Sequence, residues 1–242
     1  MDDLLGSLGA RIPLGAKQQV RRRTNRLRLG MLHRAEPFSE WSRSRGTPID
    51  RIYIEEFLAA NRAAIRGRVL EVKDAHYTQQ FGTRVTQSEV LDIDPSNQQA
   101  TVIGDLAAPD GLPVTGIDCF ILTQTLQYVT DPHRAIVNSH RLLRPGGVLL
   151  ATVPTITRID SGYQEDLDRW RFTARACEDL FGAAFGEGNT TVAAHGNLLA
   201  AVAFLAGLAA EEFAEADLRA NVPDYQMVVT IRAEKNETVA PE

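Results

Sequence analysis

The sequence predicts an α/β fold with a doubly wound, mostly parallel sheet, and two observations predict it. From Gly67 onward, short apolar segments alternate with amphipathic segments of helical length. Turn-forming stretches such as Asp94-Pro95-Ser96-Asn97 and Pro145-Gly146-Gly147 separate them. This alternation is typical of parallel strands joined by right-handed helical crossovers.

The individual elements follow from these patterns. We predict strands at 69–72, 90–93, 101–103, 117–122, 148–153, 190–194 and 225–231. A helix is expected from Thr47, as cap, and Pro48, as first residue, to about Ile65, because Ile49, Ile52, Tyr53 and Phe57 have helical spacing. Asp131-Pro132 should begin a second helix in the same way, and 198–210 reads as a buried third.

Length and charge limit the domain organisation and the partners. The 242 residues suit one domain, which we place at 61–235, after a helical extension or cap at 1–60 and before a tail at 236–242. The net charge of −5 gives the whole chain no electrostatic basis for binding nucleic acid. Seven basic residues near the start are expected to form a solvated helix face, the alternative being a contact with a membrane surface or an anionic partner: Lys17, Arg21, Arg22, Arg23, Arg26, Arg28 and Arg34.

The remaining composition predicts a cytoplasmic protein without a membrane span. The chain opens Met1-Asp2-Asp3 without an apolar leader, and its longest apolar run, 198–210, is shorter than the roughly 20 residues a bilayer requires. Cys119 and Cys177 lie in apolar patterns and read as buried hydrophobic residues. No spacing of Cys, His or acidic residues suggests a metal site.

Two carboxylates follow predicted strands at the edge where such sheets bind ligands. Asp92 ends the second strand, where a carboxylate can accept both hydroxyl protons of a ribose. Asp105 follows the third, where it can accept from an exocyclic adenine amine. Either alone is ordinary turn chemistry, but the pair in this order predicts a nucleoside site.

A longer pattern resembles the class I S-adenosylmethionine-dependent methyltransferases, in particular bacterial small-molecule members. It is carried by the strand at 117–122, Leu126, Asp131-Pro132 and the run Arg141-Leu142-Leu143-Arg144-Pro145-Gly146-Gly147, over about 67–153. Residues 223–234 resemble the family's last, antiparallel strand, and 168–173 resemble a "W-FT" segment. The resemblance implies a Rossmann-like seven-stranded sheet and S-adenosylmethionine as cofactor, with S-adenosylhomocysteine as product. It places these residues in the cofactor site: Glu71, Val72, Lys73, Asp74, Asp92, Ile93, Asp105, Leu106 and Thr123.

The first loop departs from the family pattern E-x-G-x-G-x-G. Lys73, Ala75 and Tyr77 occupy the three glycine positions, where glycine allows close approach of the backbone and unusual φ values. Three interpretations are open. The loop binds the cofactor in altered geometry, with Asp74 on the ammonium and Lys73 on the carboxylate; the protein is a non-catalytic relative; or the pocket takes another ligand.

The acceptor side is less defined. His76 and Asp50 are the candidate general bases, since the pKa of histidine lies near neutrality. Candidate substrate contacts are Arg51, Tyr53, Tyr77, Gln127, Tyr128 and Trp170, although Tyr53 also fits a core position. The predicted activity is methylation of an oxygen or nitrogen of a sugar or secondary metabolite, by a possible homodimer. The alternative is a binding protein on the same scaffold. A nicotinamide enzyme is disfavoured because no G-x-G-x-x-G follows the first strand.

Overall fold

The computed structural model describes residues 35–40, 44–160 and 167–236. The chain divides into two compact units, Met1–Phe38 and Ser39–Glu242, and every described helix and strand belongs to the second. Of the predicted helical extension at 1–60, the structure describes 35–40 and 44–60, and the basic cluster, within 1–34, lies outside the described residues. No helix in the described part is long and apolar enough to cross a bilayer.

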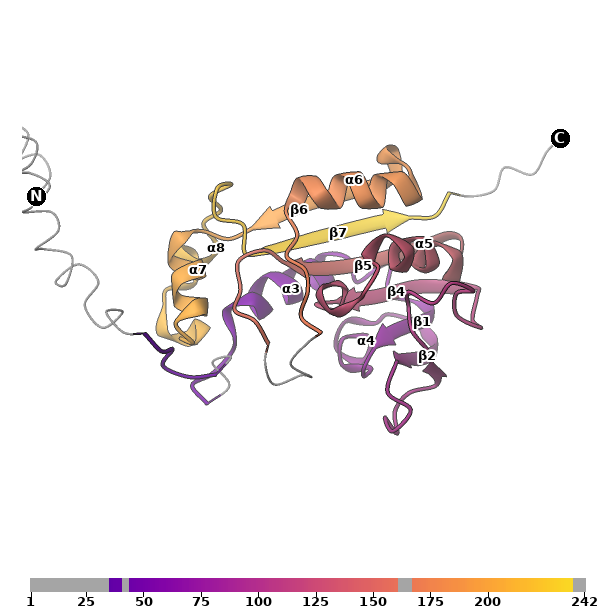
Figure 1. The fold of residues 1–242 in the computed structure, drawn as a ribbon, viewed down its shortest axis with the longest axis horizontal. Helices are drawn as coiled ribbons and strands as arrows, with labels where there is room; N and C mark the ends of the chain where they lie inside the picture. The colour runs from indigo at the N-terminus through magenta and orange to yellow at the C-terminus, as the bar shows by residue number, and fades with distance from the viewer. Residues whose placement is uncertain (1–34, 41–43, 161–166, 237–242) are drawn as a thin grey trace, which may run out of the picture. The chain divides into compact units, whose positions relative to one another are not determined.

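A seven-stranded sheet forms the centre of this unit, in the order β3-β2-β1-β4-β5-β7-β6 (Figure 1). Strand β7 runs antiparallel to both β5 and β6, while the other pairs are parallel. The predicted doubly wound sheet with an antiparallel last strand is therefore confirmed. The strands are β1 (Gly67–Val72), β2 (Val85–Asp92), β3 (Val102–Ile103), β4 (Ile117–Thr123), β5 (Leu143–Pro154), β6 (Thr190–His195) and β7 (Val228–Glu234).

Helices cover both faces of the sheet. They are α3 (Ile49–Ala60), α4 (His76–Phe81), α5 (Pro132–Leu142), α6 (Ala174–Phe185), α7 (Leu198–Leu205) and α8 (Glu215–Arg219), with single 3-10 turns at η2 (Leu126–Tyr128), η3 (Glu187–Asn189) and η4 (Ala210–Glu212). Figure 1 shows α5 and α6 on the same face of the sheet.

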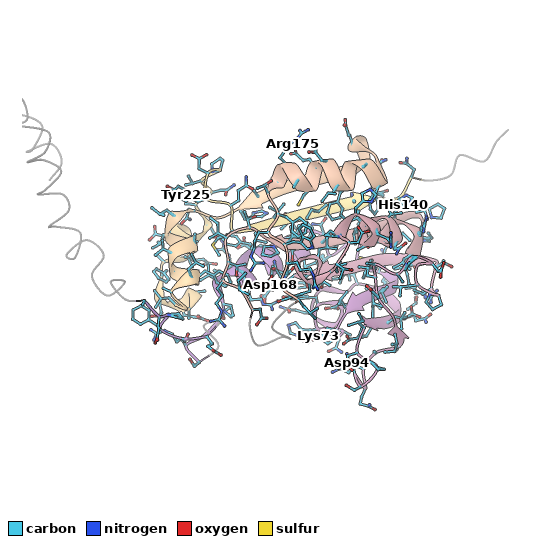
Figure 2. The ribbon with its side chains drawn as sticks, in the orientation of Figure 1. Lys73, Asp94, His140, Asp168, Arg175 and Tyr225 are labelled. Atoms are coloured by element: carbon cyan, nitrogen blue, oxygen red, sulfur yellow. The ribbon has the colours of Figure 1, made fainter. Side chains whose placement is uncertain are left out.

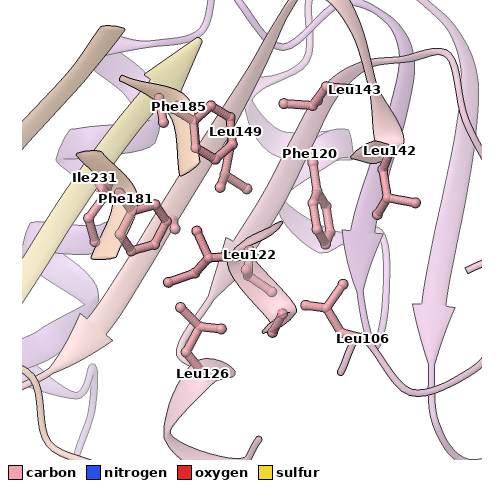
Figure 3. Close-up of a cluster of buried hydrophobic side chains, with 14 of the residues drawn as sticks. Leu106, Phe120, Leu122, Leu126, Leu142, Leu143, Leu149, Phe181, Phe185 and Ile231 are labelled. Carbon is pink, nitrogen blue, oxygen red and sulfur yellow. The ribbon is translucent and has the colours of Figure 1, made fainter. Parts of the chain in front are cut away.

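Alternating side chains of β4 pack in two separate hydrophobic cores, one on each face of the sheet. Phe120 and Leu122 pack in a cluster with residues of α5 and α6, including Phe181 (Figure 3). Cys119 and Ile121 belong to a second cluster that contains residues of α3 and α7. Because successive strand residues point to opposite faces, an apolar run such as 117–122 is buried on both sides.

The two predicted helix starts have different outcomes. Asp131 caps α5, since its Oδ1 accepts from the Arg134 amide at 3.0 Å. Thr47 does not cap α3, which begins at Ile49 after Pro48. Instead the Thr47 hydroxyl donates to Glu211 at 2.6 Å, so this side chain ties the chain to a distant loop.

Several predicted bounds are also corrected. Helix α3 ends at Ala60, before the predicted Ile65, and the Asn61 side chain donates to the Phe57 carbonyl at 2.8 Å. Strand β2 starts at Val85 rather than 90. Strand β5 starts at Leu143 rather than 148, because Leu143 already pairs with β4 before Pro145-Gly146-Gly147 and the pairing continues from Val148 after it. Strand β7 begins at Val228 rather than 225, and α7 ends at Leu205 rather than 210.

Candidate functional site

A cavity of about 800 Å³ lies at the carboxyl ends of the strands. Its wall draws on the segments after β1, β2, β3, β4 and β5 and on the first turn of α3, and Lys73 and Asp168, labelled in Figure 2, both line it. Most predicted site residues line it as well: Asp50, Arg51, Glu71, Val72, Lys73, Asp74, His76, Tyr77, Asp92, Ile93, Asp105, Leu106, Thr123, Gln127 and Tyr128.

Glu71, at the end of β1, organises the loop that follows it. The side chain is 2% exposed. Its Oε1 accepts from the Tyr77 amide at 2.9 Å, and Oε2 accepts from the Thr78 amide and hydroxyl, each at 2.7 Å. These bonds satisfy free N–H groups in the first turn of α4. Burial raises the pKa of Glu71 although the three donors oppose it.

Lys73 occupies the first glycine position of the family pattern and has the conformation that glycine favours. Its φ is 76°, in the left-handed region, where a Cβ atom costs about 1–2 kcal/mol. The Lys73 amide donates to the Leu91 carbonyl at 2.8 Å, and its carbonyl accepts from the Asn97 side chain at 2.7 Å. The backbone path of a glycine loop is therefore retained here without the glycine.

Asp92 lies at the end of β2 with its carboxylate held on both sides. Oδ1 accepts from the Asp94 amide at 3.0 Å, and Oδ2 accepts from the Asn97 side chain at 2.7 Å. The residue is 8% exposed. A carboxylate has about four acceptor sites, so this group can still accept two hydrogen bonds from a ligand. The Asn97 amide thus joins the Asp92 carboxylate to the Lys73 backbone.

The next strand end contributes Asp105 and Leu106. Asp105 Oδ1 accepts from the Ala107 amide at 2.8 Å, which shapes a turn against the cavity. Leu106 is 6% exposed and packs into the core that contains Phe120. One polar and one apolar side chain therefore adjoin in sequence at this part of the cavity wall.

Tyr77, at the third glycine position, contacts α3 through Arg51. Its ring is 4% exposed and stacks on Phe81 with centroids 6.1 Å apart. The Arg51 guanidinium donates to the Tyr77 hydroxyl, and its Cζ lies 5.9 Å from the ring centroid. The neighbouring His76 is exposed, and its amide donates to Asp74 Oδ1 at 2.9 Å.

Another part of the cavity wall carries a polar network of which the sequence patterns assigned only Tyr128 to the site. The Tyr128 hydroxyl donates to Asp160 at 3.1 Å, and the Asp160 amide donates to Asp168 at 2.8 Å. Arg171 holds the Asp168 carboxylate through two bonds, at 2.5 and 2.8 Å. Burial and the Asp160 charge raise the pKa of Tyr128 to about 12. The charged residues within 168–171 were the feature of the sequence that could have indicated this network.

Gln127 supplies a buried acceptor. It is 5% exposed, and its Nε2 donates to the Gln124 carbonyl at 2.9 Å. Within the described residues its Oε1 has no hydrogen-bond partner. A buried acceptor without a partner costs about 1–3 kcal/mol.

Two predicted substrate contacts do not line the cavity. Tyr53 is 3% exposed in the core, its hydroxyl donates to the Leu218 carbonyl at 2.6 Å, and its ring stacks on His195. Trp170 lies outside the cavity lining, where its indole donates to the Val129 carbonyl at 2.8 Å. Both side chains therefore have structural partners of their own. Among the described residues no group of His, Cys, Asp and Glu is arranged to hold a metal ion.

Comparison with known proteins agrees with this geometry. Residues 72–151, about a third of the chain, match a family model described as a methyltransferase domain. No curated protein matches the chain. Together with the strand order, the family model confirms the resemblance to class I methyltransferases.

Similar solved structures share the fold at low sequence identity. The [4+2]-cyclase SpnF has 15% identity and a TM-score of 0.52, with 85% of this chain and 88% of that chain covered. The N-methyltransferase NodS from Bradyrhizobium japonicum WM9, solved with S-adenosyl-L-homocysteine, has 15% identity, a TM-score of 0.50, and coverage of 85% and 95%. An S-adenosylmethionine-dependent methyltransferase from Mesorhizobium loti has 14% identity and a TM-score of 0.50, with 77% of this chain and 98% of that chain covered. At these identities the likeness establishes the fold.

Proposed function

We propose that this chain binds S-adenosylmethionine and transfers its methyl group to an oxygen or nitrogen of a small molecule, such as a sugar or secondary metabolite. The observation that carries the proposal is the Asp92 carboxylate, held on the cavity wall by Asp94 and Asn97 with acceptor capacity to spare. The methyltransferase-domain match and the bound S-adenosyl-L-homocysteine in NodS support the choice of ligand.

The nucleoside half of the site fits this cofactor. Asp92 would accept the two ribose hydroxyls, and Asp105 would accept from the adenine amine while Leu106 packs on the ring. Ile93, exposed at 62% and on the cavity wall, offers further apolar surface to the base. These roles use acceptors and apolar area that the fold has already positioned, so binding requires little reorganisation.

The methionine half also has room. Lys73 keeps the left-handed backbone, so the loop can pass close to a ligand despite its side chains. The cavity volume of about 800 Å³ lies in the upper part of the range of roughly 300–1,000 Å³ for small-molecule sites. That size suits a cofactor and a small acceptor together.

Bound S-adenosylmethionine would supply a methyl group on a positively charged sulfur, ready for in-line displacement. The chain then needs to orient the acceptor and remove its proton. His76 and Asp50 line the cavity and are the proposed bases. Gln127 Oε1 would accept a hydrogen bond from the acceptor's N–H or O–H, which would satisfy a buried group.

The first experiment is calorimetric titration with S-adenosylmethionine and S-adenosylhomocysteine. Turnover is then measured as S-adenosylhomocysteine release over a panel of sugars, amines and phenols. The proposal expects saturable binding of both nucleosides and release with at least one acceptor class. Failure of both ligands to bind at millimolar concentration would contradict it.

The second candidate function is a binding or otherwise repurposed protein on the same scaffold. Side chains at all three glycine positions favour it, and SpnF, named as a [4+2]-cyclase, has the same fold. Nucleoside binding without methyl release over the whole acceptor panel would select this candidate. A homodimer and a cytoplasmic location stay predictions.

A further inference from the structure

Arg51 presents a guanidinium to the cavity that has no direct carboxylate partner in the described part of the chain. It lies in the first turn of α3, lines the cavity and is half-buried. Its guanidinium donates to the Tyr77 hydroxyl, and within the described part of the chain no carboxylate oxygen lies within 4.0 Å of its nitrogens. A guanidinium stays charged and offers five donors, so most of its hydrogen-bonding capacity is left for a ligand.

Tyr77 fixes where that charge lies. Its amide is bound by the buried Glu71 carboxylate, and its ring is packed against Phe81. Burial raises the pKa of Tyr77, so the hydroxyl stays neutral and accepts from Arg51. The side chain at the third glycine position therefore holds a cation beside the loop, 26 residues away in sequence, where the family has only backbone.

The charges around Arg51 match a zwitterion. Carboxylates of Asp50, Glu55 and Asp74 line the same cavity. A guanidinium without a direct carboxylate partner among the described residues, close to the carboxylates of Asp50 and Glu55, is complementary to a ligand that carries one carboxylate and one ammonium group. The amino-acid tail of S-adenosylmethionine has both.

We infer that Arg51, positioned by Tyr77, binds the carboxylate of the cofactor's amino-acid tail, the role that the sequence suggested for Lys73. This inference rests on the proposed function. The planar guanidinium can engage both carboxylate oxygens, whereas an ammonium is a point charge. Lys73 is exposed, and water weakens the attraction of an exposed ammonium for an anion. A carboxylate on the methyl acceptor is the other source of the same chemistry, and the test separates the two.

Two ligands that differ only in the amino-acid tail test the assignment. S-adenosylhomocysteine carries the tail, and 5′-deoxy-5′-methylthioadenosine keeps the nucleoside and sulfur without it. We expect Arg51→Gln to weaken the binding of S-adenosylhomocysteine by about tenfold or more, the loss typical of a charge-assisted pair. The affinity for the tail-less ligand should change by less than about twofold. Tyr77→Phe should give a smaller loss with the same selectivity. The exposed Arg62, just beyond α3, provides the control Arg62→Gln, which should change neither affinity.

Each contrary pattern overturns the inference in a recognisable way. Unchanged S-adenosylhomocysteine affinity in Arg51→Gln rejects it, and equal losses for both ligands show a structural role instead. If cofactor binding is unchanged and only turnover of an anionic acceptor falls, the guanidinium serves the acceptor. If Arg51→Gln does not fold, Arg51→Lys, which keeps the charge, should still weaken S-adenosylhomocysteine selectively. Wild-type protein that binds neither ligand contradicts the proposed function itself, before any variant is compared.

Discussion

Replacing Lys73 by glycine should stabilise the protein, because Lys73 has a left-handed backbone at φ 76°. Relief of the Cβ clash is worth about 1–2 kcal/mol. Glycine also gives the unfolded chain extra freedom, which costs about 0.4–1 kcal/mol. The free energy of unfolding should therefore rise by about 1 kcal/mol. The bonds to Leu91 and Asn97 use backbone atoms of Lys73, so the substitution retains them.

Lys73→Ala is the matched control, since it removes the same side chain but keeps the Cβ atom. Urea unfolding of the two variants should show the glycine form more stable by about 1 kcal/mol, with a Tm about 2–4 °C higher. Both should bind S-adenosylhomocysteine as the wild type does, because Arg51 rather than Lys73 is assigned to the tail. A glycine variant no more stable than the alanine variant would refute the strain argument.

Three further predictions concern the cavity wall. Asp92→Ala should weaken S-adenosylhomocysteine binding at least tenfold by calorimetry, from the loss of charge-assisted bonds worth about 1.5–3 kcal/mol; unchanged affinity would move the ribose elsewhere. Of His76→Ala and Asp50→Asn, one should lower kcat at unchanged cofactor affinity and remove the acid limb of the pH–rate profile; if neither does, another group is the base. Asp168→Asn should lower the free energy of unfolding by about 2 kcal/mol at pH 7, since the Asp168 carboxylate is 3% exposed and paired with Arg171. Burial opposes ionisation of Asp168, but its bonds to Arg171 and the Asp160 amide bring its pKa below the usual value. Its contribution is therefore complete above about pH 3.9 and lost as pH falls through the folded-state pKa. The dependence of the urea midpoint on pH in that acid range should be weaker in the variant than in the wild type.

The sheet was predictable because its strands are buried on both faces or end in turn residues. The bounds that sequence missed have a physical cause. The first half of β2 pairs only with β1, since β3 meets β2 only at Leu91 and Asp92. Thr86, Gln87 and Ser88 are consequently exposed and polar, and no apolar pattern marks them as a strand.

The cavity lining was predictable where it depends on strand ends, as at Asp92 and Asp105, and not where it depends on helix orientation. Arg51 and Tyr53 are two positions apart on α3, so they point to different sides of the helix. Arg51 lines the cavity, and Tyr53 packs in the hydrophobic core. Periodicity alone does not say which side of a helix faces a ligand.

Long-range contacts are the remaining part that the sequence does not reveal. The Arg51–Tyr77 bond spans 26 residues, and the Tyr128–Asp160 bond spans 32. Each joins side chains from different segments of the chain that line the cavity. Only the folded chain shows that a substituted glycine position also receives a cation.

Titration of the wild-type protein with S-adenosylhomocysteine in a calorimeter decides whether the altered loop still leaves a working cofactor site. We expect saturable one-to-one binding, tighter than that of 5′-deoxy-5′-methylthioadenosine because Arg51 binds the carboxylate of the tail. No binding at millimolar ligand would contradict a working cofactor site. Equal affinity for the two ligands would show that the methionine half of the site does not function.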